Sequence, residues 1–447
     1  MRRHLSICFL AAALAVTHPS ARANGLPTNL LPNPSFERGQ VRPDPWSTFA
    51  LQGGNWEFNG HDGERCVSVS GSGEDSAWWA VRGLGVKPNR LYRVSYWVRR
   101  DRLATGGAAV AGLDWVSREA LVHRGWERRE FFLRTPDVIL ADAFFRVGQR
   151  QVNGRLYFDQ VSLTPAVVAH CRRDALQLPL GAGESTKGGR YTAKHELSGP
   201  GSSEARFLAR FDARFDRDRW VFQGPGSVVY RHSLGRLRQT EAEIEVAVSE
   251  RHRGVLIVEA SKDGELWLAI GDVAAPKQVA FPVPVELLPA RELWVRLRSG
   301  ANADLAVAGY CYRCRLLEGE ATADATGASC YLAVVRESRD VEVEILSLGD
   351  PWGGARTAAE VVVSNKGPRR LLRVALSVVE QGSEAARAEE TVSVGTGASR
   401  RVTLGYEIKS PGDHALRITC AAAEEGSVMW EAECDLCILP GDAPPEA

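Results

Sequence analysis

Net charge is the first thing that this sequence lacks, because 55 Lys and Arg residues balance 55 Asp and Glu residues over its 447 residues. Without an excess of either sign, neither nucleic acid nor an acidic surface is the obvious partner. Beyond residue 23, the sequence also lacks an apolar run long enough to cross a bilayer. The length suits three domains of ordinary size better than one core.

The one pronounced apolar run extends from Leu5 to Val16 and follows Arg2 and Arg3. The small residues Ala21-Arg22-Ala23 come next, so residues 1–23 have the pattern of a cleaved secretory signal peptide. The apolar run is too short to span a membrane. We therefore expect a protein that is secreted, periplasmic or held at the cell surface.

Recognisable catalytic signatures are also missing. The nine histidines are scattered, and no H-E-x-x-H, G-x-S-x-G, phosphate-loop or dinucleotide-binding motif occurs. Carboxylates are numerous, but hydrolysis of a glycosidic bond needs two of them facing each other in a deep cleft. We predict that the protein is not an enzyme, with an unrecognised catalytic sandwich as the alternative.

Eight cysteines follow the signal sequence, at positions 66, 171, 311, 314, 330, 420, 434 and 437. Two pairs have the C-x2-C spacing of half a zinc site, but both pairs lie in strand-like sequence without a turn residue. On a strand, positions i and i+3 point to opposite faces, which disfavours both zinc and a disulfide within a pair. Cross-strand disulfides and buried free thiols are both compatible with the sequence.

Long apolar periods of 3.6 residues are absent, so little helix is expected. Short alternating runs dominate instead, as in Tyr92–Val98 and Glu241–Val248, and Gly, Pro and Asn interrupt them. This pattern is typical of β-sandwiches, in which alternate side chains face the core. We predict an all-β protein of three consecutive sandwiches, over residues 24–168, 185–318 and 330–440.

Five groups of motifs occur in order along the first block. They are Asn29–Glu37 with Pro45-Trp46, then Gly63–Val69, Val86–Val98, Gly125-Trp126 and Leu156–Leu163. Together they resemble carbohydrate-binding modules of the family 4 and 9 type. The resemblance implies a jelly-roll of two antiparallel sheets, opened by a strand over Asn29–Glu37, that binds polysaccharide, with a β-glucan or xylan as the expected type.

Binding a sugar requires flat apolar side chains for the C–H face of the ring and planar polar side chains for its hydroxyls. In the first block, the candidate carbohydrate-binding residues are Trp56, Trp78, Trp97, Trp115, Arg93 and Gln149. Trp46 and Trp126 match framework positions of the family, so we expect both in the core. Any single candidate tryptophan could also be a core residue, but a domain of this size can hardly bury all seven of its tryptophans.

The same resemblance implies a structural calcium ion between the two ends of the first block. Its ligands would be Ser35 or Glu37, the carbonyl oxygen of Gly63 and the carboxylate of Asp159. Calcium prefers several oxygen ligands of this mixed kind. Alternatively, Asp159 caps a turn or pairs with an arginine.

The other two blocks resemble modules with less specific roles. Glu259–Trp267 is similar to a hairpin of galactose-binding, discoidin-like sandwiches, with Lys262-Asp263-Gly264 as its turn and Trp267 returning to the core. The third block, with Ala359–Gly367 and Pro411–Ile418, resembles bacterial adhesion-related immunoglobulin-like domains, which usually act as spacers.

These features predict a non-catalytic, exported polysaccharide-binding protein. Two alternatives stay open. The first is a structural or adhesion protein of the cell envelope that binds no sugar, and the second is an accessory part of a glycoside hydrolase system.

Overall fold

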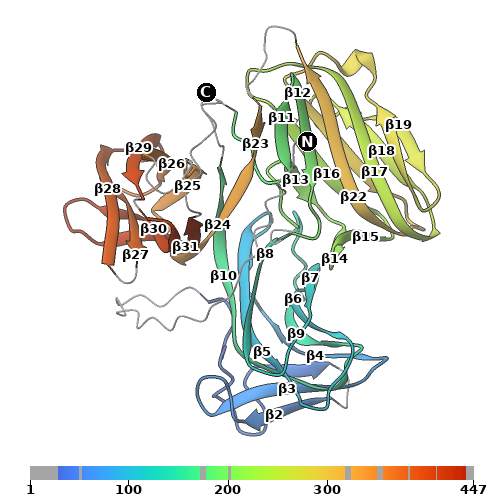
Figure 1. Ribbon diagram of the computed structural model, residues 1–447, viewed down its shortest axis with the longest axis vertical. Coiled ribbons are helices and arrows are strands. Elements are labelled where there is room, and N and C mark those ends of the chain that lie inside the picture. The colour runs from blue at the N-terminus through green and yellow to red at the C-terminus, as the bar shows by residue number, and fades with distance from the viewer. Residues whose placement is uncertain are drawn as a thin grey trace.

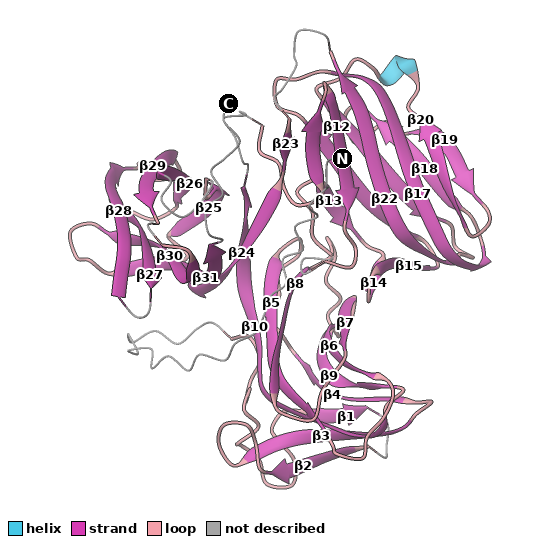
Figure 2. Ribbon diagram, in the orientation of Figure 1, coloured by secondary structure: helices cyan, strands magenta, loops and turns pink. Residues whose placement is uncertain are grey.

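The structure is a computed structural model that describes residues 29–49, 53–171, 178–199, 203–317, 324–349, 356–380, 383–408 and 410–438. Strands make up most of these residues, and their one helical element is a short 3-10 turn, Val285–Leu287 (Figure 2). The all-β prediction is confirmed. No described helix has the length and apolar character needed to cross a bilayer. The predicted signal peptide, residues 1–23, lies outside the described residues.

The first sandwich consists of two antiparallel five-stranded sheets, shown at the bottom of Figure 1. One sheet has the order β1 (Ser47–Phe49), β4 (Ser76–Arg82), β9 (Phe144–Arg150), β6 (Ala108–Leu113), β7 (Val116–Ala120). The other has the order β2 (Gly54–Phe58), β3 (Arg65–Ser72), β10 (Asn153–Cys171), β5 (Leu91–Arg100), β8 (Glu127–Arg134). The core between the sheets contains Phe36, Trp46, Phe145 and Phe158, all fully buried.

The segment that was expected to open the jelly-roll is not a strand. Residues 29–37 form bends and turns, and Asn33 and Phe36 have positive φ angles of 49° and 58°. The segment is still fastened to β10, because the Val161 N–H donates to the Pro34 carbonyl oxygen at 2.8 Å. Phe36 and Val161 therefore close the same end of the core, with no side-chain exposure in either residue.

The second sandwich lies at the upper right of Figure 1. Its first sheet has the order β13 (Leu208–Phe211), β16 (Gly226–Ser233), β21 (Glu292–Ser299), β18 (Leu256–Ser261), β19 (Leu268–Val273). Its second sheet has the order β14 (Arg214–Asp216), β15 (Arg219–Gln223), β22 (Asp304–Leu316), β12 (Arg190–His195), β11 (Glu184–Lys187), β23 (Ala325–Thr326). Strand β17 (Gln239–Arg253) also pairs with β22, and β20 (Lys277–Pro282) pairs with β17.

The turn predicted at Lys262-Asp263-Gly264 is present. Gly264 has a φ of +76°, and the Asp263 carboxylate accepts the N–H groups of Glu265 and Leu266. Trp267, however, does not return to the core. It is half-buried, with the Arg296 guanidinium 4.3 Å from its ring centroid, because the strand after the turn lies at the edge of its sheet.

The third sandwich has a separate core and lies at the left of Figure 1. One sheet contains β24 (Ala328–Arg336), β31 (Val428–Ile438), β30 (Gly412–Ala422), β27 (Leu371–Glu380) and β28 (Ser383–Ser393). The facing sheet contains β25 (Val341–Ser347), β26 (Arg356–Asn365) and β29 (Ser399–Glu407).

Strand pairing joins all three sandwiches. Strand β10 pairs with β3 and β5 over residues 153–165, and its last residues, 166–171, pair with β24 of the third sandwich. The boundary predicted at residue 168 therefore falls within a strand. Strand β7 pairs in parallel with β14, which merges one sheet of each of the first two sandwiches into a single 13-stranded sheet. The three units are joined by backbone hydrogen bonds and not by linkers alone.

Candidate functional site

The predicted carbohydrate-binding residues do not form one cluster. Trp97 and Arg93 lie on β5, and both point outward because their neighbours Val94, Tyr96 and Val98 are buried in the core. Trp78 lies on β4 in the opposite sheet, so it is on the other side of the sandwich. Of the remaining candidates, Trp56 packs against the core of the first sandwich, Gln149 is buried within it, and Trp115 lies beside the second, as described below.

An aromatic and polar surface surrounds Trp97, and we call it the Trp97 face; it consists of Glu57, Ser68, Trp97, Arg99, Arg155 and Tyr157. Tyr157 on β10 pairs with Ser68 on β3 and with Arg99 on β5. Arg155 lies two residues before Tyr157 on β10, and Trp97 lies two residues before Arg99 on β5. Since residues two apart on a strand share a face, these side chains all point away from the core.

Two aromatic side chains from loops extend the Trp97 face. The His61 ring stacks on Trp97, with ring centroids 3.6 Å apart and an angle of 15° between the rings. Trp126 meets His61 edge-on at 5.8 Å. Trp126 was expected in the core, but it is half-buried at the rim of this face, whereas Trp46 is fully buried as expected. Partial burial lowers the pKa of His61, although Asp62 acts in the opposite direction.

Planar polar groups lie beside these rings. The Arg99 guanidinium is 3.8 Å from the Tyr157 ring centroid and 5.2 Å from that of Trp126. The Glu57 carboxylate accepts the Ser68 hydroxyl at 2.7 Å and an N–H of Arg155 at 2.8 Å. The face therefore combines flat apolar surface with ordered donors and acceptors, which is what a sugar ring and its hydroxyls require.

Arg93 lies on the same sheet but nearer to the other sandwiches. Its Nε atom is 3.9 Å from a carboxylate oxygen of Glu130. On β8, Phe132 stacks on Tyr331 of the third sandwich, with ring centroids 4.8 Å apart. This contact covers that end of the sheet. On the Trp97 face, Ser68 and Tyr157 are buried, and the other four side chains are half-buried.

Trp78 contacts residues of its own sheet in the first sandwich, whereas Trp115 lies where the first sandwich meets the second. Trp78 stacks on Phe49 with ring centroids 5.0 Å apart, and the Arg146 guanidinium is 5.0 Å from its ring centroid. Trp115 follows β6 in the turn to β7, where it packs against the core and its carbonyl oxygen accepts the Phe215 N–H at 2.7 Å.

Trp56 packs against the core of the first sandwich, and Gln149 is buried within that sandwich. The indole N–H of Trp56 donates to the Phe36 carbonyl oxygen at 2.8 Å, and Arg65 covers the ring at 4.5 Å. Gln149 is fully buried; its amide donates to Asp75 at 3.0 Å and accepts the Val152 N–H at 2.9 Å. Because both ends of this amide are used within the fold, the structure places Gln149 away from any ligand surface.

Two of the predicted calcium ligands, Asp159 and Glu37, accept backbone N–H groups of the same loop, residues 61–65. Asp159 is fully buried, and its carboxylate accepts the N–H groups of His61 at 2.7 Å and Gln160 at 2.7 Å. Glu37 accepts the N–H groups of Glu64 and Arg65 at 3.1 and 3.0 Å. Gly63 has a φ of +96°, and a Cβ atom there would lie 2.4 Å from a carboxylate oxygen of Glu37. Ser35 is half-buried in the adjoining turn.

The carboxyl group of Asp159 has a perturbed pKa. Burial raises the pKa of Asp159 to about 6, and the Glu37 carboxylate contributes to the increase. The arrangement matches the turn-capping alternative, since Asp159 accepts the N–H groups of His61 and Asp62 in the 60–62 turn. Among the residues that the structure describes, no group of three or more His, Cys, Asp or Glu side chains has the arrangement of a metal site. A cation here would therefore depend on carbonyl oxygens together with the carboxylates of Glu37 and Asp159.

Sequence reasoning missed His61, Glu57, Arg155 and Tyr157. The period of two along β10 could have indicated that Arg155 and Tyr157 share a face, because Leu156 and Phe158 between them are strongly apolar. His61 has no such signal, since it lies in a loop and meets Trp97 only after the chain folds.

Comparison with known proteins finds similarity in structure alone. No protein-family model and no curated protein matches the sequence. Among solved structures, a family 16 carbohydrate-binding module is 19% identical, covers 30% of this chain and 99% of its own, and has a TM-score of 0.26. A tandem of two family 22 carbohydrate-binding modules from Paenibacillus barcinonensis Xyn10C is 10% identical, covers 66% of this chain and 100% of its own, and has a TM-score of 0.27.

Enzymes are also among the similar structures. A β-glucuronidase from Bacteroides uniformis is 8% identical, covers 49% of this chain and only 27% of its own, and has a TM-score of 0.19. The similar modules belong to families 16 and 22, whereas the sequence motifs resemble families 4 and 9. At these identities and TM-scores, none of the similarities carries an argument about ligand or activity.

Proposed function

We propose that this chain is an exported, non-catalytic polysaccharide-binding protein and that the Trp97 face holds the glycan chain. The observation that supports this proposal is the aromatic cluster of Trp97, His61 and Trp126 beside the planar groups of Arg99, Arg155 and Glu57. The sugar ring would lie with its C–H face against the aromatic surface, and its hydroxyls would exchange hydrogen bonds with the arginines and the carboxylate.

The proposed binding is weak for each site. Covering one tryptophan face removes roughly 100 Å² from water, which contributes about 2–3 kcal/mol at about 25 cal/mol per Å². This gain and a few hydrogen bonds must offset an association cost of about 4–15 kcal/mol. The expected dissociation constant is therefore on the order of micromolar to millimolar.

Retention of the full chain on insoluble polysaccharides tests the proposal. We expect retention on one polymer from a panel of β-glucans, xylan and mannan, and we expect Trp97→Ala to abolish it. Trp267→Ala is the matched control, because Trp267 is also a half-buried tryptophan whose ring is covered by a planar side chain, but it lies in the second sandwich. Equal retention of the Trp97→Ala and wild-type proteins, with both shown to be folded, would contradict the assignment to this face.

A calcium ion is proposed as a structural component of the same sandwich. Glu37 and Asp159 would supply carboxylate oxygens, and Gly63 and Ser35 would add a carbonyl and a hydroxyl oxygen, which is a donor set that calcium accepts. The supporting observation is the raised pKa of Asp159 beside Glu37, since a cation would stabilise both ionised carboxylates. The ion would join the 29–39 segment to β10 at Asp159 and would take no part in binding sugar.

A structural or adhesion role is the second candidate, and the joined strands favour it. Strand β10 belongs to two sandwiches, and Arg90 of the first sandwich pairs with Glu337 of the third at 2.5 Å. Such joints keep the three units in fixed positions, as a spacer requires. A folded protein that is retained on no polysaccharide would favour this role over sugar binding, and retention that depends on a co-purified glycoside hydrolase would favour an accessory role.

A further inference from the structure

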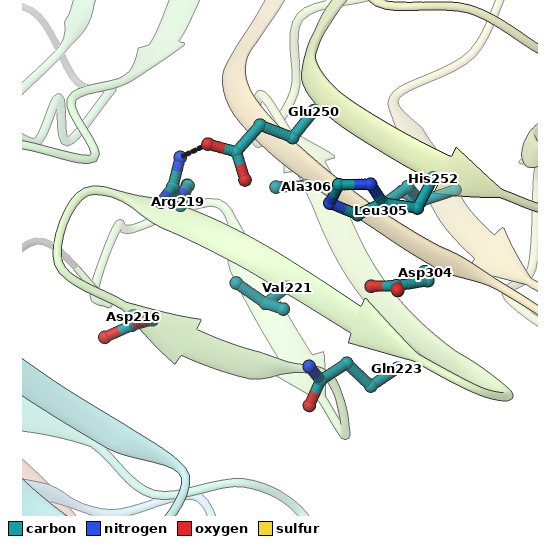
Figure 3. Close-up of a pocket in the computed structure, with 9 residues that line it drawn as sticks. All are labelled: Asp216, Arg219, Val221, Gln223, Glu250, His252, Asp304, Leu305 and Ala306. Atoms are coloured by element: carbon teal, nitrogen blue, oxygen red, sulfur yellow. Dashed lines mark hydrogen bonds and ion pairs between the residues drawn. The ribbon is translucent and has the colours of Figure 1, made fainter. Parts of the chain in front are cut away.

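A polar hollow lies on the 13-stranded sheet that the first two sandwiches share, away from the Trp97 face. It has a volume of about 190 Å³ and lies on the second sandwich, where β15, β22 and β17 run side by side (Figure 3). The hollow is open to solvent, so one ring of a longer glycan chain can enter it.

Side-chain size along the central strand explains the hollow. Ala306 on β22 pairs with Val221 of β15 on one side and Glu250 of β17 on the other, so a small residue lies between two larger ones. The register of β17 shifts on both sides of Glu250, and such bulges twist a strand and redirect its side chains. Arg219 and Glu250 then form an ion pair of 2.6 Å across β22, as Figure 3 shows.

Free polar groups gather around the apolar floor of Val221 and Ala306. Gln223 and Asp304 are neighbours in the sheet, and His252 lies near Asp304 in Figure 3. No side-chain hydrogen bond or ion pair is found for these three residues within the described part of the chain. An amide, an imidazole and a carboxylate beside a small apolar floor can exchange several hydrogen bonds with vicinal hydroxyls.

The charges around the hollow select the ligand. Asp216, Glu250 and Asp304 provide three carboxylates against one arginine, Arg219, which Glu250 already engages. Anionic sugars are therefore disfavoured, whereas hydroxyl groups can donate to the carboxylates. Asp216 also reaches the first sandwich, because it accepts the Ser117 hydroxyl at 3.4 Å and lies 3.9 Å from Arg150.

We propose that this hollow is a second saccharide site, which binds one ring of a neutral glycan at the seam between the first two sandwiches. The proposal relies on the proposed function for the class of ligand, but it involves different residues from the Trp97 face. A protein with both sites would gain avidity on a polymer, since the second contact is intramolecular after the first has formed.

The test uses calorimetric titration of the full chain with neutral cellohexaose, xylohexaose and mannohexaose. Cationic chitosan hexamer and anionic oligogalacturonate are the comparison probes. Asp304→Asn keeps the shape of the side chain and removes its charge, while the double variant Gln223→Ala/His252→Ala removes two hydrogen-bonding groups. Gln278→Ala on β20 is the matched control, because it is an exposed glutamine in the same sheet but outside the hollow.

We expect one neutral hexamer to bind, and we expect each hollow variant to raise its dissociation constant about fivefold to tenfold. Gln278→Ala should leave the constant unchanged. Wild-type affinity in both hollow variants overturns the inference, and so does binding of only the anionic or cationic probe. If Trp97→Ala alone weakens binding, the proposed function stands and this inference fails. If only the hollow variants weaken binding, the hollow is supported and the Trp97 face is not.

Discussion

The Sγ atoms of Cys330 on β24 and Cys434 on β31 lie 3.6 Å apart, although 104 positions separate the two residues in the chain. Both strands belong to the sheet that β10 enters from the first sandwich. The hydrogen bond from Cys434 lowers the pKa of the Cys330 thiol. Because thiolates attack disulfides, this pair is well placed to oxidise in the compartment to which the predicted signal peptide would lead.

We expect oxidised glutathione to convert these two thiols into one disulfide, with loss of two hydrogens from the protein and reduction of glutathione disulfide to two glutathione molecules. The thiol count should fall by two, and peptide mapping should identify Cys330 linked to Cys434. The bond should raise the free energy of unfolding of the third sandwich by about 2–4 kcal/mol. Cys311 and Cys314, three residues apart on β22, serve as internal controls that should not pair. Mapping that finds no Cys330–Cys434 link would contradict the prediction.

Removing a buried charge pair should loosen the contact between the first two sandwiches. Arg134 on β8 and Glu204, which precedes β13, form an ion pair of 2.5 Å, and the Glu204 side chain is only 1% exposed. Glu204→Ala should lower the free energy of unfolding by about 3–5 kcal/mol, because it leaves Arg134 without its partner. Chemical denaturation measures the change. Glu337→Ala breaks the more exposed pair with Arg90 and should lower the free energy of unfolding by less than about 1 kcal/mol. An equal loss in the two variants would contradict the prediction that the buried pair contributes more.

Stability without calcium should fall as the pH rises. Burial raises the pKa of Asp159 from 3.8 to about 6, so the folded protein holds this proton more tightly than the unfolded chain does. The contribution of the protonated carboxyl to stability is therefore present at low pH and is lost as the pH rises through about 6. Thermal unfolding in chelator between pH 4.5 and 7.5 should show the decrease. Asp159→Asn should remove it, whereas Asp62→Asn in the neighbouring exposed loop should not.

Calcium should reverse this trend if it binds as proposed. Adding calcium at pH 7.5 should raise the melting temperature of the wild-type protein and leave that of Asp159→Asn unchanged. An equal response of both proteins would show that the ion binds elsewhere, and no response of the wild type would rule out the proposed calcium site.

A side chain at position 63 should disturb the same loop. Gly63 has a φ of +96°, and a Cβ atom would lie 2.4 Å from a carboxylate oxygen of Glu37. Gly63→Ala should therefore lower the free energy of unfolding by about 1–3 kcal/mol. Gly85→Ala is the control, since Gly85 has open space around its Cβ direction and no positive φ. Urea denaturation of the two variants measures the difference, and equal stabilities would contradict the strain argument.

The alternation of buried and exposed side chains along a single strand was predictable from the sequence. In Tyr92–Val98, the sequence places Arg93 and Trp97 opposite Val94 and Val98, and the structure buries the valines and leaves the other two half-exposed. The turn at Asp263-Gly264 was predictable for a similar reason, because a single glycine with positive φ defines it. These features depend on residues close together in the chain, so the sequence contains all the information needed.

The sequence by itself thus determined the all-β architecture, the inward and outward positions in a clearly alternating strand such as Tyr92–Val98, and the tryptophans available to form a surface. Only the tertiary structure decided that Trp97 meets His61, that Trp78 faces the other side of the sandwich, and that Gln149 lies inside the core. It also decided that β10 belongs to two sandwiches and that Ala306 lies under a polar hollow. Such contacts depend on which strands pair and in what register, and pairing is set by the packing of whole sheets between residues far apart in the chain.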